Sequence, residues 1–163
     1  MSALTPKTKM QVVVSDTWTL LAPNPQSKLS HFGALVIRVG VGLFIAGFHG
    51  WHKLAQGIAY IQSGTHWPLL EDVQTLGLPL PVVNAFAATI IQLVGGVAVA
   101  AGFLTRFAAF AVAVSLCVAA YSNLLTGKDN QLALLYAVIF FGFSLYGGGW
   151  YSVDAKLFGR RSG

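Results

Sequence analysis

The sequence predicts an all-α integral membrane protein: a four-helix bundle with an interfacial segment between helices 1 and 2. The first observation is charge, since 9% of residues are charged, against about 25% in soluble domains. The second is an apolar fraction of 55% and a mean hydropathy of +0.67. The third is that four apolar segments approach the length of about 20 helical residues that a bilayer requires.

The first predicted span runs from Phe32 to Leu54 and carries all its ionisable groups on one face. These are Arg38 and the basic residues of the string FHGWHK, which are His49, His52 and Lys53. At about 100° per residue, these side chains fall within an arc of roughly 100°. A lipid-facing arginine at a helix centre costs about 2.5–3.5 kcal/mol. We therefore expect this face to point into the bundle.

Residues 55–80 join the first two spans and have a mixed composition. We expect a partly helical segment at the membrane surface, anchored by Tyr60 and Trp67. Pro81 suits the first turn of the next helix. The other spans are predicted at Pro81 (or Val82) to Leu104, Arg106 to Leu125 and Gln131 to Gly148. Their short connections favour antiparallel neighbours.

Small residues accompany the polar face. Gly42, Ala46 and Gly50 repeat every four residues in the first span, which allows a neighbouring helix to approach closely. The second span offers Gln92 and Gly96 at the same spacing, and the third offers a stripe that includes Ser115. The five polar side chains predicted to line the bundle interior form the candidate polar seam: Arg38, His49, His52, Lys53 and Gln92.

Two interpretations of the seam's basic residues stay open. The predicted spans contain no Asp or Glu, so Arg38 needs amides, hydroxyls, backbone carbonyls, water or a ligand, unless it snorkels to the cytoplasmic headgroups. His49 and His52 either contact a small polar headgroup or form an interfacial rim with Trp51. Two histidines do not make a zinc site, and no metal site is predicted.

The distribution of basic residues predicts the orientation. Residues 1–29 form a cytoplasmic leader, 30–157 the four-helix domain and 158–163 a basic tail. Seven basic residues lie on the side of the termini, and two lie on the other side, namely Lys53 and Lys128. The positive-inside rule then places both termini in the cytoplasm.

Several classes of function are excluded by what the sequence lacks. The net charge of +5 is scattered and forms no basic stripe, so no nucleic-acid partner is expected. The lone Cys117 allows neither an internal disulfide nor a dithiol centre. Nucleotide, flavin and hydrolase motifs are absent. Any electron carrier is therefore a partner protein or a lipid-soluble molecule.

Short motifs resemble the DoxX family of small bacterial membrane proteins. The first is Arg38 followed by Phe48-His49-Gly50 and Lys53-Leu54. The others are Gly77-Leu78-Pro79, Gln92-Leu93-Val94-Gly95-Gly96, Gly102-Phe103-Leu104-Thr105-Arg106 and the closing Gly147 to Asp154. The likeness covers about residues 30–157. One departure is Gln92, which stands where the family often has an intramembrane glutamate, and it argues against a proton-coupled role.

The resemblance implies a multi-pass protein of the bacterial inner (plasma) membrane. Some relatives are linked to quinone-coupled oxidoreductases, including a thiosulfate:quinone oxidoreductase subunit, and others to oxidative or thiol stress. It thus implies a membrane subunit of such a redox system, with quinone as ligand, a partner oxidoreductase, and activity only with that partner. The alternative is a non-catalytic scaffold or homo-oligomer in which the polar stripe joins helices. A small transporter is a third reading.

Overall fold

The computed structural model describes residues 28–158. Most of the predicted leader and the tail after Phe158 lie outside them. The helices are α2 (Lys28–Phe44), the π-helix η1 (Ile45–Trp51), α3 (His52–Ser63), α4 (Pro68–Thr75), α5 (Pro81–Ala101), α6 (Thr105–Leu125), α7 (Gln131–Tyr146) and α8 (Val153–Phe158). The predicted all-helical membrane bundle is confirmed.

The first helix is longer than predicted. It does not end at Leu54, because α2, η1 and α3 form one helical stretch, Lys28–Ser63, of 36 residues. At 1.5 Å per residue this is about 54 Å, more than the ~30 Å of a bilayer core. In the described part of the chain, Pro81–Ala101 and Thr105–Leu125 are also long and apolar enough to cross a membrane. Helix α7 is apolar but shorter, at 16 residues.

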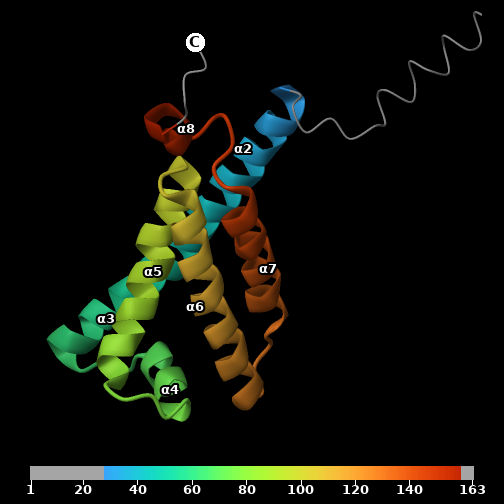
Figure 1. Cartoon of the computed structure of the whole chain (residues 1–163). Helices are drawn as coiled ribbons and strands as arrows, with labels where there is room; N and C mark the ends of the chain where they lie inside the picture. The colour runs from blue at the N-terminus through green and yellow to red at the C-terminus, as the bar shows by residue number, and fades with distance from the viewer. Residues whose placement is uncertain (1–27, 159–163) are drawn as a thin grey trace, which may run out of the picture.

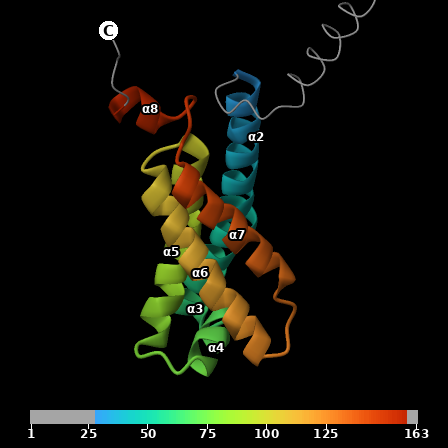
Figure 2. The ribbon, with the colours of Figure 1, turned by 45° about the vertical axis from the view of Figure 1, so that its right-hand side comes forward.

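The helices run up and down between two ends (Figure 1). The start of α2, the α5–α6 turn and α8 lie at one end, whereas the end of α3, helix α4 and the α6–α7 loop lie at the other (Figures 1 and 2). Helix α5 contacts α2, η1, α3, α4 and α6, and α7 packs on α6. This places α5 at the centre of the bundle.

Helix α5 lies against the first helix at almost backbone contact. A Cβ atom added at Gly42 would lie 2.6 Å from the Gly96 carbonyl oxygen, and one at Gly50 would lie 2.6 Å from the Leu93 Cα. No other residue fits at such positions without moving a helix. The small-residue stripes predicted from the sequence therefore do meet.

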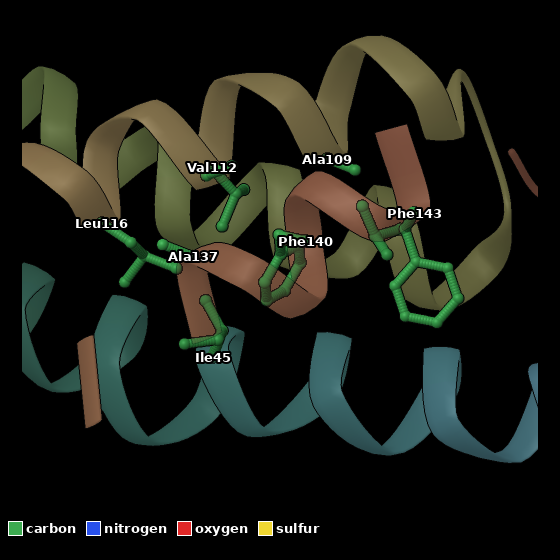
Figure 3. Close-up of a cluster of buried hydrophobic side chains, with 9 residues drawn as sticks. Ile45, Ala109, Val112, Leu116, Ala137, Phe140 and Phe143 are labelled. Atoms are coloured by element: carbon green, nitrogen blue, oxygen red, sulfur yellow. The ribbon is translucent and has the colours of Figure 1, made fainter. Parts of the chain in front are cut away.

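Two apolar clusters fill the interior. The larger joins η1, α5, α6 and α7, and Figure 3 shows part of it around Phe140 and Ile45. The smaller fixes α4 to α5 through Trp67, Leu70, Val73 and Ala85. Trp67 does not act as the membrane-surface anchor that we expected, because its side chain is only 2% exposed and its ring lies 4.8 Å from that of Phe86.

Candidate functional site

A cavity of about 380 Å³ lies at the end of the bundle that holds α4. Side chains from the first helix, α4, α5, α6 and α7 line it, together with the α6–α7 loop. Its volume falls within the range of small-molecule sites, about 300–1,000 Å³. Four of the five predicted seam residues line this cavity: His49, His52, Lys53 and Gln92.

A chain of hydrogen bonds crosses the cavity from α3 to α6. The Lys53 Nζ donates to the Gln92 Oε1 at 3.1 Å, and the Gln92 Nε2 donates to the Ser115 Oγ at 3.3 Å. Gln92 is only 1% exposed, so its amide is fixed by these two partners. Within residues 28–158 the ion pairs are His66–Glu71 and Lys128–Asp72, and Lys53 is in neither. The hydrogen-bond partner of Lys53 in the cavity is thus the neutral amide of Gln92.

The histidines occupy the wall formed by the first helix. His49 faces Tyr136 edge-on, with ring centroids 6.2 Å apart, and Phe44 stacks on the same tyrosine at 5.8 Å. The His52 Nε2 lies 3.1 Å from the Gln56 Nε2. Across the described residues, no group of three or more His, Cys, Asp or Glu side chains is placed to hold a metal ion.

The opposite walls are mainly apolar. Helix α4 contributes Leu69, Val73 and Leu76, and helices α6 and α7 contribute Leu116, Val118, Ala119, Leu132, Ala133 and Tyr136. The cavity also has polar lining residues at this end: Asp72 on α4, Asn123 near the end of α6 and Asp129 in the α6–α7 loop. The cavity therefore suits a molecule with an apolar body and a hydrogen-bonding head.

Arg38 does not line the cavity, so the predicted seam is not continuous. Its side chain is 2% exposed and donates to the Gly148 carbonyl and to the Tyr151 carbonyl at 2.8 Å. Of the partners considered for this arginine, backbone carbonyls are the ones observed. The helical wheel ignores distance along the axis, and Lys53 lies about 22 Å further along the helix.

The segment that binds Arg38 is also held by Asp154. The carboxylate of Asp154 accepts hydrogen bonds from the backbone N–H of Leu104 at 2.7 Å and of Thr105 at 2.9 Å, and from the Thr105 hydroxyl. It thus caps the start of α6. The short helix α8 is capped by Ser152, whose Oγ accepts from the Ala155 N–H at 3.0 Å.

Ser115, Tyr136 and Asp72 are cavity residues with polar groups that were not among the predicted site residues. Ser115 lies on the small-residue stripe of its span, so the sequence carried a signal for it. Tyr136 lies on a helix that is apolar on all sides, and Asp72 lies on α4, which was expected at the membrane surface. Neither of these two has a sequence pattern that connects it to the cavity.

The apolar helices and the enclosed polar chain define a helical membrane protein with an internal site. The sequence profile of the DoxX family matches residues 33–124, more than half of the chain, and the protein belongs to the DoxX family. The closing motif at residues 147–154 lies outside this match. Neither a curated protein nor a solved structure matches the chain significantly.

Proposed function

We propose that the cavity binds the ring of a quinone and that the protein is a membrane subunit of a quinone-linked or thiol/oxidative-stress redox system. The observation that carries this proposal is the chain Lys53–Gln92–Ser115 beside apolar walls. A quinone has carbonyl oxygens that accept hydrogen bonds and a flat apolar ring. The hydrogen-bonding side chains of the cavity suit the quinone oxygens, and its apolar walls suit the ring.

The roles of the residues follow from their atoms. Lys53 donates to a quinone carbonyl, and Gln92 holds the ammonium in place through the bond it already accepts. His49 and His52 offer further ring nitrogens, and Tyr136 offers an aromatic face. A bound quinone would supply electron-accepting chemistry, with the electrons coming from a partner oxidoreductase. Gln92 is a neutral amide and positions groups without carrying a proton.

The location proposed with this function is the bacterial inner membrane. The chain would cross it four times with both termini in the cytoplasm, and α7 would be the shortest crossing. The cavity would then lie towards the outer face. Lipid would cover the exposed apolar side chains of α5 and α6, such as Val94 and Phe107.

Quinone binding tests the proposal directly. In lipid nanodiscs, a short-chain quinone should bind the wild-type protein, and Lys53→Met and Gln92→Leu should each weaken binding at least about tenfold. A hydrogen bond to a charged group contributes about 1.5–3 kcal/mol. Titration calorimetry gives the affinities, and thermal unfolding shows whether each variant is folded.

Lys156→Met is the matched control, since it removes a lysine that lies outside the cavity. It should leave the affinity unchanged. Equal affinities for Lys53→Met and Lys156→Met would contradict quinone binding at this site. That result would favour the scaffold alternative, which the glycine contacts between the first helix and α5 support.

A further inference from the structure

Helix α4 is held to the bundle in two different ways on its two sides. Towards α5 the contact is apolar, through Leu70 and Val73, which are 7% and 6% exposed, with Trp67 at the helix start. Towards α6 the contact is polar. Because α4 and α6 both line the cavity, this polar contact joins two of its walls.

Within residues 28–158, the hydrogen bonds and ion pairs from α4 to α6 and to the α6–α7 loop all involve Asp72. The Ser122 hydroxyl donates to the Asp72 carbonyl oxygen at 3.0 Å, and the Lys128 Nζ lies 2.5 Å from the Asp72 Oδ1. The ion pair is half exposed on the lysine side, at 51%. Such pairs are weak and sensitive to salt.

The segments on either side of α4 contain glycines that suit a hinge. Gly64 and Gly77 have φ angles of +66° and +67°, and nothing lies within 4 Å of a Cβ built on either. Such a φ favours glycine, and the open surroundings leave room for movement. Helix α4 can therefore turn about its apolar contact with α5 while its polar contact with α6 breaks.

We propose that α4 is a gate over the cavity, held closed by Asp72 through Ser122 and Lys128. Opening separates α4 from α6 and exposes the cavity to water at that end of the bundle. The gate controls access to the cavity that the proposed function uses, and in that respect this inference rests on the proposed function. Asp72 and Lys53 line the same cavity, so gate opening moves a carboxylate away from the residue that would bind the ligand head.

The test measures access to the cavity without any ligand. Ser115 is replaced by cysteine in a Cys117→Ala background, and the rate of its reaction with a charged methanethiosulfonate is followed by mass spectrometry in nanodiscs. Asp72→Asn and Lys128→Gln should each raise this rate about two- to fivefold, the factor that a partly exposed ion pair supplies. The exchange Asp72→Lys with Lys128→Asp should restore the slow rate.

Glu71→Gln is the matched control, since it removes the neighbouring acid, which pairs with His66 and not with α6. It should leave the rate unchanged. Raising the salt concentration should speed the wild-type reaction and leave Asp72→Asn unaffected. Equal rates for Asp72→Asn and Glu71→Gln, or no recovery in the exchange, would overturn the gate.

The two proposals fail separately. If quinone does not bind but Asp72 controls access to the cavity, the proposed function is wrong and the gate is supported. If quinone binds and access does not depend on Asp72, only the gate falls.

Discussion

Arg38 shows how a buried cation can serve the fold of a membrane protein. Among residues 28–158 its guanidinium has no carboxylate in hydrogen-bonding contact, and it binds the carbonyls of Gly148 and Tyr151. The planar guanidinium holds its N–H donors in a fixed fork that suits two carbonyls, whereas a lysine ammonium is a point charge on a flexible stem. The side chain therefore ties the first helix to the segment after α7. Asp154 continues this connection to the start of α6.

Asp154 gives a prediction about pH. Burial alone would raise the pKa of Asp154, but hydrogen bonds from Thr105 and Leu104 and the charge of Arg38 lower it below its ordinary value. The unfolded chain therefore binds more protons near pH 4, so the carboxylate stabilises the fold above its unfolded pKa of about 3.9 and loses this effect as pH falls through its lower folded value.

Asp154→Asn should therefore lower the melting temperature at neutral pH. The difference from the wild type should stay constant above about pH 5 and shrink below about pH 4. Thermal unfolding in mild detergent from pH 7 to pH 3 measures it. A difference of the same size at every pH would show that the charge of Asp154 is irrelevant to stability.

The contact between the first helix and α5 shows how a glycine, which has no side chain, lets two whole helices pack closely. Gly50 lies so close to Leu93 that any Cβ would meet backbone atoms. In the same turn, Gly47 has nothing within 4 Å of its Cβ position. Gly50 thus faces helix α5, whereas Gly47, three residues earlier, faces open space.

Gly50→Ala should destabilise the bundle by about 1–3 kcal/mol, the usual cost of overpacking a tight contact. Gly47→Ala should cause no loss, because its methyl group meets no neighbour. Thermal unfolding of both variants in the same detergent makes the comparison. A similar fall in melting temperature for both would mean that helix propensity, and not the α5 contact, explains the effect.

The whole molecule has two chemically distinct ends. One end holds Arg38, Arg106 and the short helix α8, and the other holds α4, the cavity and the α6–α7 loop. The proposed orientation assigns the first end to the cytoplasm. This orientation is the one that the distribution of basic residues along the sequence predicts.

Cysteine labelling in intact bacterial cells tests this orientation. In a Cys117→Ala background, Thr75→Cys on α4 should react with a membrane-impermeant maleimide added outside. Leu157→Cys on α8 should react only after lysis. The parent without cysteine is the control, and labelling of Leu157→Cys before lysis would reverse the orientation.

Composition was sufficient to predict the class of fold. Few charged residues together with apolar runs long enough to cross a bilayer indicate a helical membrane bundle. The site was predicted less completely. His49, His52, Lys53 and Gln92 share a cavity, but Arg38 lies roughly 16–22 Å from the three basic residues along the axis of the first helix. The helical-wheel projection also assumes α-helical geometry. Because η1 is a π-helix, the side chains after it are rotated about the helix axis from the positions that the projection gives.

The position of α4 is the part that the sequence could not provide. Its composition fits a membrane-surface helix equally well, and the burial of Trp67 against Phe86 shows that it lies on α5. Contacts between residues far apart in the chain, such as Asp72 with Lys128, leave no local pattern in one sequence.

The contact between Arg38 and Gly148 joins residues 110 positions apart, and this separation affects how the protein is made. The ribosome releases the first helix long before it completes the last loop. A nascent chain therefore carries this arginine into the membrane without its carbonyl partners until residues 148–151 have been synthesised. Insertion of the first helix must tolerate an unpaired cation, and the contact that holds Arg38 forms only after the later helices have been made.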